Sequence, residues 1–346
     1  MRHYHVSSNN GDEVLNNLLS ECLNCYASCS SIGKTINPCP KYNGLRRQGI
    51  ISNNRGMTFL CCDETKTTKL FREKLEAFSY AFHDIRLLKE DYIKEAKITE
   101  QIKVNRLVHN LTSINAHNIQ EIYDLVPQEL LASSYQKQLD YIQSEIKRNI
   151  KKTALMFLRI AKHNIHMKSE FSIYRKLDRE DAILEFRNHP IQKVIMNILH
   201  TFFSDFSDLG IYVEVGDYFD KVYIDYESIQ VALYHLIENA SKYAMPESRI
   251  TIEFTNNDKN VDVSFKMRSL YIDDDETQKI FDEGYSGKMA KICALNGDGI
   301  GMWRINQMMS LNKGSVKIIN GKNKIGINEK VYADNEFILT FLKQKK

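Results

Sequence analysis

Apolar residues recur at intervals of three and four over long stretches of the chain where helix-breaking residues are scarce. Residues 57–209 contain no glycine, and their only prolines are Pro127 and Pro190. Apolar residues at this spacing form one stripe of an amphipathic helix, and a stretch without breakers allows the helix to be long. The pattern predicts one helix over Thr67–Tyr123 and a second over Gln128–Lys168, joined by a turn around Pro127.

Each predicted helix carries an apolar stripe that needs a partner. The stripe of the first helix contains Leu70, Leu75, Phe78, Phe82, Ile85 and Leu88. The stripe of the second contains Leu139, Ile142, Ile146, Ile150, Leu155, Leu158 and Ile160. Because a two-helix hairpin buries little surface alone, we expect two chains to pair into a homodimeric four-helix bundle. A monomeric helical domain that folds back on itself is the alternative.

After Pro190 the pattern changes to short alternating segments mixed with helices. Helices are predicted over 191–206, 227–243 and 300–311, and strands over 211–215, 221–225, 249–254, 261–267, 315–319 and 337–342. Strands of this kind interleaved with helices are typical of an α/β sandwich with a mixed sheet. The predicted fold class is α+β, with a long helical hairpin followed by such a sandwich. The predicted domains are residues 1–64, 65–184 and 185–346.

Composition and charge narrow the classes of function. The length of 346 residues is typical of two or three domains, and 43% hydrophobic with 26% charged residues is an ordinary globular balance. A net charge of +3 is too small to indicate a nucleic-acid or anionic-membrane partner. No apolar run approaches the ~20 residues of a membrane-spanning helix. We therefore expect a soluble, cytosolic protein that binds neither nucleic acid nor membrane.

Four of the seven cysteines lie close together in the N-terminal segment 1–64, which is a candidate sensor region. They are Cys22, Cys25, Cys29 and Cys39. Four thiolates can bind Zn²⁺ or an iron–sulfur cluster, although this spacing matches no standard signature. Reduced cysteines that cluster by chance are the alternative, since cytosolic cysteines form few structural disulfides.

The predicted helix over 227–243 carries polar residues suited to a metal–phosphate ligand. Residues 233–244 read LYHLIENASKYA, with Glu238, Asn239 and Lys242 on or near the face opposite the apolar stripe. An asparagine carbonyl is a hard oxygen ligand of the kind Mg²⁺ prefers. Lys242 is suited to lie near phosphate charge. A plain surface amide is the alternative for Asn239.

A glycine-rich turn precedes the helix over 300–311. Residues 297–302 read GDGIGM, with glycines at alternate positions. Glycines let the backbone approach phosphate groups closely, and the following helix offers free N–H groups and the positive end of its dipole. No strand is predicted directly before the turn, which argues against a dinucleotide-binding βαβ unit.

Together these two segments resemble the N-box and second glycine box of the histidine-kinase and gyrase-type ATPase superfamily. Between them IFDEGYSGKMA, residues 280–290, resembles the F-box and the start of the ATP lid. The resemblance covers residues 185–346 and implies a sandwich that binds ATP and Mg²⁺. It implies roles for Asn239 (Mg²⁺), Gly297, Gly299, Ile300 and Gly301 (phosphates), Lys242 and Tyr243 (nucleotide), and Ser286, Gly287 and Lys288 (lid). Glu238 is a candidate for orienting the reacting groups, with a surface acid as the alternative.

One position departs from the family pattern. The first glycine box of the family has an aspartate that accepts the adenine amino group. Here Met267 stands at that position, and Ser269 stands at the position of the first glycine. The recognition of adenine therefore needs a different acceptor in this chain.

The hairpin before the ATPase resembles the domain that carries the phosphoacceptor histidine in histidine kinases. Residues 109–113 read HNLTS, which has the amide residue and the later serine of the family's H-box. Residues 83–86 read HDIR, which has the acid but lacks the later polar residue. Along a hairpin paired over its full length, His83 lies nearer the tether of the ATPase, whereas the motif favours His109. His109 is therefore the predicted phosphoacceptor and His83 the alternative.

These features predict a sensor histidine kinase that autophosphorylates a bundle histidine. The phosphoryl group would then pass to an aspartate on the receiver domain of a separate response regulator, as the resemblance implies. One alternative is a catalytically degenerate module that binds ATP as an interaction switch, which Met267 favours. The other is an ATP-driven conformational clamp as in gyrase relatives, which the hairpin argues against.

Overall fold

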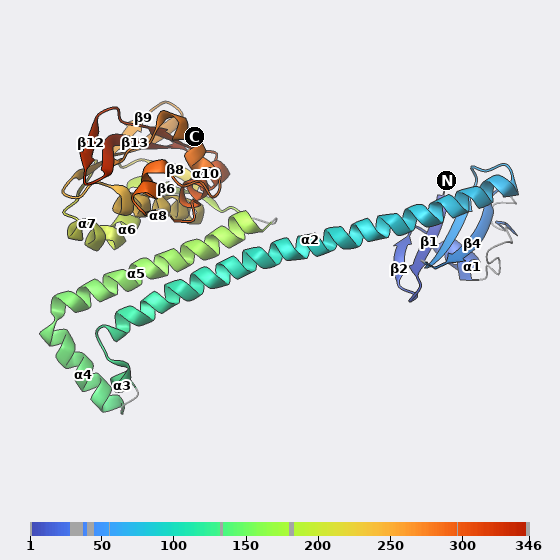
Figure 1. Ribbon diagram of the computed structural model, residues 1–346, viewed down its shortest axis with the longest axis horizontal. Helices are drawn as coiled ribbons and strands as arrows, with labels where there is room; N and C mark the ends of the chain where they lie inside the picture. The colour runs from blue at the N-terminus through green and yellow to red at the C-terminus, as the bar shows by residue number, and fades with distance from the viewer. Residues whose placement is uncertain are drawn as a thin grey trace. The chain divides into compact units, whose positions relative to one another are not determined.

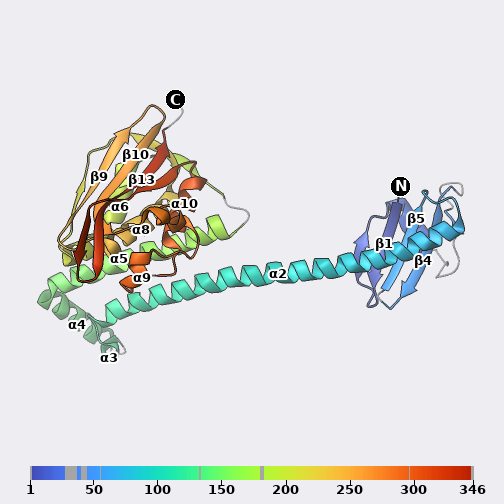
Figure 2. The ribbon, with the colours of Figure 1, turned by 45° about the horizontal axis from the view of Figure 1, so that its top comes forward.

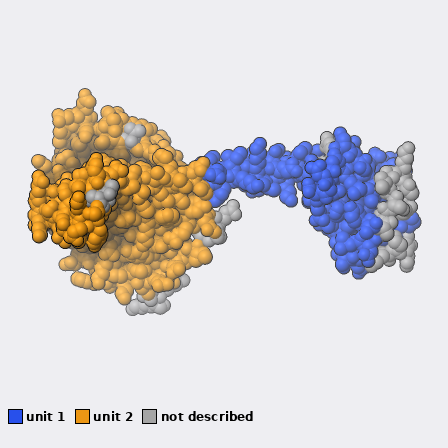
Figure 3. Space-filling model, turned by 90° about the horizontal axis from the view of Figure 1, so that it is seen from below, with its two compact units in different colours: residues 1–102 blue, residues 103–346 orange. Residues whose placement is uncertain are grey.

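A computed structural model of the chain describes residues 2–27, 37–39, 45–54, 56–131, 134–179, 183–295 and 297–343, without the side chains of residues 25, 83 and 131. The chain divides into two compact units, Met1–Ile102 and Lys103–Lys346 (Figure 3). Each is described by itself below.

The first unit contains an antiparallel sheet with the strand order β2-β1-β5-β4-β3, which the sequence analysis did not identify. Its strands are β1 (Arg2–Ser8), β2 (Glu13–Asn16), β3 (Asn37–Pro38), β4 (Arg47–Asn53) and β5 (Gly56–Cys62). Alternate residues of β5 point to opposite faces of the sheet and pack into two separate small hydrophobic cores. Phe59 and Cys61 pack with residues near helix α1 (Ser20–Ala27), and Leu60 and Cys62 pack with the start of helix α2.

Helix α2 (Thr68–Tyr123) confirms the first predicted helix and contains residues of both units (Figure 1). The second predicted helix is wrong as one continuous element. It is divided into α3 (Gln128–Leu131), α4 (Tyr135–Arg148) and α5 (Ile150–Ile173). At Asn149, between α4 and α5, the backbone leaves helical geometry with φ −131° and ψ 56°. Helix α5 then runs past the predicted end at Lys168 and continues as a π-helical turn over Tyr174–Asp178.

Among the described helices that follow the hairpin turn, α5 is the one that pairs with the C-terminal part of α2, in antiparallel fashion (Figures 1 and 2). Matched contacts along the pair join Arg106 to Asp178, Asn110 to Glu170, Asn118 to His163 and Glu121 to Arg159. The end of the second arm therefore lies beside residues 103–110. The expectation about His83 assumed a hairpin paired over its full length, whereas these contacts place the end of the second arm beside Arg106 and Asn110.

The second unit ends in an α/β sandwich that confirms the predicted α+β fold class. Its sheet has the order β11-β13-β10-β9-β7, with β12 paired to β13, and it is mixed because β7 and β9 are parallel. The strands are β7 (Tyr212–Val215), β9 (Arg249–Asn256), β10 (Asn260–Leu270), β11 (Ser315–Ile319), β12 (Lys324–Ile327) and β13 (Lys330–Leu342). A separate pair is formed by β6 (Phe186–Pro190) and β8 (Lys221–Asp225).

Helices pack against one face of this sheet and form a continuous core with it. They are α6 (Ile191–Leu199), α7 (Phe203–Asp208), α8 (Tyr226–Tyr243) and α10 (Gly301–Leu311), with the short α9 (Lys288–Ile292) before α10. The helix predicted over 191–206 is interrupted by a 3₁₀ turn at His200–Phe202. Strands β6 and β12 and the first half of β13 were not predicted. The helices and strands that carry the glycine turn and Asn239 lie where the sequence predicted them.

Candidate active site

A cavity of about 670 Å³ lies in the second unit between the helix pair and the sandwich. Its walls include residues of α2, α5, α8, the C-terminal end of β10, the lid and the segment that leads into α10. Among the predicted site residues, the following line it: His109, Glu238, Asn239, Lys242, Tyr243, Ser269, Ser286, Gly287, Gly297, Gly299, Ile300 and Gly301. Lys288 is not among the lining residues, and the side chain of His83 lies outside the described residues.

Helix α8 places its polar residues at the cavity, and its N-terminus is fixed by capping and by an ion pair. The Asp225 carboxylate caps the helix by accepting the backbone N–H of Ser228 at 2.9 Å, and it also pairs with Lys176 at 2.8 Å. Nearly all residues of the first three turns are buried. The half-buried Asn239 then faces the cavity. Its Nδ2 group contacts the sulfur of Met302, and its Oδ1 atom accepts no hydrogen bond from the described residues.

A free amide oxygen at this place fits a hard divalent cation such as Mg²⁺. The exposed Lys242 ammonium lies close to the glycine turn, since a Cβ built at Gly297 would be 3.6 Å from Lys242 Nζ. The Tyr243 hydroxyl donates to the carbonyl of Leu295 at 3.3 Å, so it holds the end of the lid segment.

The glycine turn is shaped by a close approach of two backbones. Gly299 has φ +70°, and a Cβ there would lie 2.5 Å from the carbonyl carbon of Gly284. The Gly284 N–H donates to the Gly299 carbonyl at 3.1 Å. Gly301 differs, because its Cβ would meet only the Asn239 side chain at 3.6 Å, an ordinary contact. Gly299 is therefore needed for the backbone packing of the turn itself, in addition to its predicted place near phosphate.

A buried carboxylate that the sequence analysis missed organises the lid. Glu276 accepts hydrogen bonds from the Tyr285 hydroxyl at 2.9 Å, the Lys288 N–H at 2.7 Å and the Asp273 N–H at 3.2 Å. The Ser286 hydroxyl donates to the Gly297 carbonyl at 3.2 Å, which joins the lid to the glycine turn. The Lys288 ammonium, by contrast, pairs with Asp273 and Asp275 on the exposed side. These two carboxylates hold the pKa of Lys288 above its usual value.

The wall that corresponds to the first glycine box carries no carboxylate from β10. Met267 and Ser269 both line the cavity and are buried. Asn335 on β13, opposite Met267 in the sheet, donates to the Ser269 hydroxyl oxygen at 2.8 Å. Ser269 is therefore the polar side chain that β10 offers at this wall.

Several histidines meet in the cavity, and most of them escaped the sequence analysis. His109 and His117 come from α2, and His163 and His166 come from α5. The dipeptide His-Asn of the motif at His109 also occurs at His117 and His163. The same dipeptide could therefore have identified both histidines as candidates for the site. His83 belongs to the first unit, and its side chain lies outside the described residues.

Glu238 lies beside a buried histidine at the cavity wall. Its Oε2 atom is 3.4 Å from His235 Nδ1, and its Oε1 atom accepts from the Tyr234 hydroxyl at 3.5 Å. Burial lowers the pKa of His235, which favours the neutral imidazole. The Glu238 side chain is 39% exposed, so its carboxylate can reach the solvent of the cavity.

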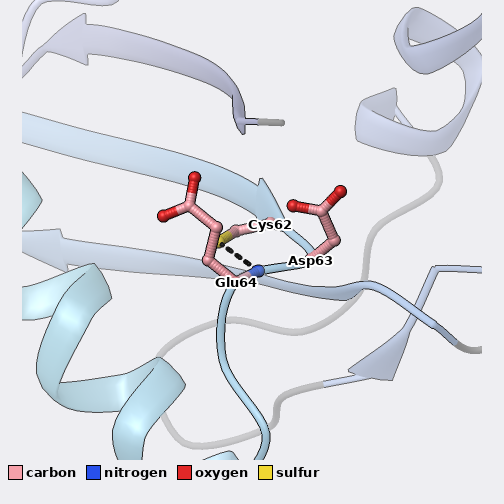
Figure 4. Close-up of side chains that lie close together, drawn as sticks. All are labelled: Cys62, Asp63 and Glu64. Carbon is pink, nitrogen blue, oxygen red and sulfur yellow. Dashed lines mark hydrogen bonds between the residues drawn. The ribbon is translucent and has the colours of Figure 1, made fainter.

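The predicted cysteine site receives no support from the residues that the structure describes. Cys22 and Cys39 are buried, the Cys25 side chain and Cys29 lie outside the description, and Cys22 Sγ contacts His3 Nδ1 at 3.7 Å. Within the described part of the chain, three potential metal ligands converge within 4.8 Å only at Cys62, Asp63 and Glu64 (Figure 4).

Ion pairs account for this second cluster without a metal. The Glu64 carboxylate binds the Arg2 guanidinium at 2.8 Å and the Lys74 ammonium at 2.5 Å. These two cations lower the pKa of Glu64 to about 2. Cys62 is fully buried in the core formed with α2.

Within the described residues, none of the helices combines the length and apolar character needed to cross a bilayer. No protein-family model and no curated protein sequence matches the chain.

Similar solved structures were found for about half of the chain or more. The mycobacterial sensor histidine kinase MprB is 15% identical with a TM-score of 0.39, covering 47% of this chain and 100% of that chain. The nucleotide-free catalytic domain of histidine kinase ThkA is 19% identical with a TM-score of 0.38, covering 47% and 100%. The Acinetobacter baumannii histidine kinase AdeS is 13% identical with a TM-score of 0.38, covering 69% and 98%. All three structures are of histidine kinases.

Proposed function

We propose that the chain is a sensor histidine kinase that transfers the γ-phosphoryl group of ATP to His109. The observation that carries the proposal is the shared cavity, in which His109 of α2 faces the same space as Asn239 and the glycine turn. A phosphoryl transfer needs the nucleophile and the phosphates in one enclosed place, since catalysis rests mainly on positioning and charge neutralisation.

The roles of the residues follow from their placement. The backbone of Gly297, Gly299 and Gly301, with the N-terminus of α10, would hold the phosphates. Asn239 would supply an oxygen ligand to Mg²⁺, which neutralises phosphate charge when it is bound. A neutral ring nitrogen of His109 would attack the γ-phosphorus, and the bond to the bridging oxygen would break so that ADP leaves. Glu238 would orient the reacting groups.

Labelling with γ-³²P-ATP tests the proposal on the full chain. The expected product is labelled protein whose label is lost in acid and kept in base, as a phosphohistidine requires. An unlabelled protein that nevertheless binds ATP would contradict kinase activity and favour the alternative of a nucleotide-gated interaction module. Met267 supports that alternative, because β10 offers no carboxylate for the adenine amino group.

The partners proposed for this function are a second copy of the chain and a response regulator. Large apolar side chains of α2 remain exposed in one chain, among them Leu88, Tyr92 and Ile102. Pairing of two chains along the helix would cover them and form a four-helix bundle with α5. We also propose that residues 1–64 form the sensing domain, 65–184 the dimerisation and phosphoacceptor domain, and 185–346 the catalytic domain.

A further inference from the structure

A buried ion pair joins the helix pair to the sandwich at the wall of the cavity, which both of its residues line. Arg304 of α10 donates from Nη1 to Glu170 Oε1 at 2.6 Å and from Nη2 to Glu170 Oε2 at 3.3 Å. Each of the two residues is 3% exposed. Glu170 belongs to α5, 134 residues earlier in the chain. Two parallel hydrogen bonds between a guanidinium and a carboxylate fix both distance and orientation.

The same carboxylate also holds the helix that carries the phosphoacceptor. Asn110, which follows His109 on α2, donates to Glu170 Oε2 at 2.8 Å. His166 Nε2 lies 3.7 Å from Glu170 Oε1, and the Arg304 guanidinium lies 3.4 Å from His235 Nε2 on α8. The cluster therefore connects four helices, including the one that bears Asn239.

Stability alone does not explain such a pair. Removing two charges from water offsets most of their attraction, so a well-packed apolar pair in the same place is often as stable or more stable. An apolar pair, however, lacks the directional hydrogen bonds that fix the relative orientation of the two helices. Arg304 lies three residues after Gly301, so its orientation is tied to the glycine turn. Asn110 binds the same carboxylate and directly follows His109 in the chain.

We propose that Glu170 and Arg304 are positioning residues of the phosphoryl transfer, which hold the α2 histidine in register with the glycine turn. The inference rests on the proposed function. It assigns the pair to the reaction step, because Arg304 fixes α10 against α5 and Asn110 links α2 to the same carboxylate. The groups proposed to bind the nucleotide, on α8, the lid, the glycine turn and the N-terminus of α10, do not include either member of the pair.

The test measures nucleotide affinity, phosphorylation rate at saturating ATP, and melting temperature in the full chain. Arg304→Met should reduce the labelling rate roughly tenfold or more, as expected for a misplaced reacting group. Its affinity for a fluorescent ATP analogue should remain within about threefold of the parent value. Because this variant leaves a buried carboxylate, a second variant, Glu170→Leu with Arg304→Met, removes both charges. This double variant should recover the melting temperature but not the labelling rate.

Ser264→Ala is the control, since the buried Ser264 hydroxyl donates a hydrogen bond to the Glu336 carboxylate within the sheet, away from the residues that line the cavity. It should lower the melting temperature and leave the labelling rate of the folded protein unchanged. If the double variant recovers both the melting temperature and the rate, the pair is only structural and the proposal is wrong. A faster rate in either Arg304 variant would also overturn it, because the contact would then restrain the reaction. A parent protein that takes no label would instead overturn the proposed function, and this inference with it.

Discussion

At the scale of single residues, the candidate site depends on a few atoms whose surroundings are unusual. The Oδ1 atom of Asn239 faces the cavity without a hydrogen-bond donor from the described residues. Gly299 has a left-handed backbone that touches another backbone. A side-chain change at each position therefore has a distinct physical consequence.

Asn239→Asp should weaken the binding of Mg-ATP roughly tenfold or more, the range expected when a metal site loses a well-placed partner. The added charge alters the ligand field and repels phosphate. Isothermal titration with Mg-ATP measures the effect. Asn306→Asp, on α10 and outside the cavity, is the matched control and should bind like the parent. Equal affinities for the parent and Asn239→Asp would show that this asparagine holds no metal.

Gly299→Ala should destabilise the sandwich, whereas Gly301→Ala should not. The first substitution places a Cβ in a left-handed residue and 2.5 Å from the Gly284 backbone. Backbone strain of that kind costs about 1 to 3 kcal/mol before the clash is added. Urea denaturation of the variants measures the free energy of unfolding. Gly326→Ala, where nothing lies within 4 Å of the added Cβ, is the control. An unchanged stability for Gly299→Ala would contradict this account of the turn.

At the scale of elements, the sandwich was more predictable than the hairpin. Helix α8 and the turn before α10 each carry their polar residues within one short segment. The motif of each could therefore be recognised from consecutive residues of the sequence. The breaks around α4 are not, because residues 128–168 contain no glycine or proline and yet the helix stops at Asn149. The Glu170–Arg304 pair was equally out of reach, since it joins residues 134 positions apart. The N-terminal sheet was missed because β1 and β5 are distant partners.

The contact between α5 and α10 should give the second unit a specific response to acid. Burial alone would raise the pKa of Glu170, but the bonds from His166 and Asn110 and the charge of Arg304 hold it well below its usual value. A carboxyl whose pKa is lowered by folding stabilises the folded state above its unfolded pKa of about 4.3. That contribution is lost as the pH falls below this value toward the folded pKa.

Glu170→Gln should therefore cost about 3 to 5 kcal/mol at pH 7, because it leaves the Arg304 charge buried without a counter-ion. The difference from the parent should shrink as the pH falls below about 4.3. Denaturant titrations of both proteins from pH 7 to pH 3 measure it. The exposed Glu129 supplies a control, Glu129→Gln, whose difference should stay near zero throughout. If the difference in the free energy of unfolding between the parent and Glu170→Gln stays constant with pH, the proposed ionised pair is contradicted.

At the scale of the whole molecule, α2 is the element shared by the two units, since the boundary between them falls at Ile102 within the helix. It starts soon after β5 of the N-terminal sheet and ends at the hairpin turn beyond His109. The helix therefore links the N-terminal sheet in the chain to the residues around His109. The two candidate histidines lie on either side of the boundary, and this difference makes their roles testable.

His109→Gln should abolish autophosphorylation while ATP binding stays intact, and His83→Gln should leave most of the label. The reason is placement, because His109 lines the same cavity as the residues proposed to bind the nucleotide. In addition, the chain that leads from α5 into the sandwich passes beside Arg106, through the Arg106–Asp178 contact. His83 lies 20 residues before Lys103 and belongs to the other unit. Acid-labile label is counted for each variant, with His117→Gln included because His117 lines the same cavity. Label lost only in His83→Gln would move the site there, and label that survives substitution of all three would exclude a phosphohistidine at these positions of α2.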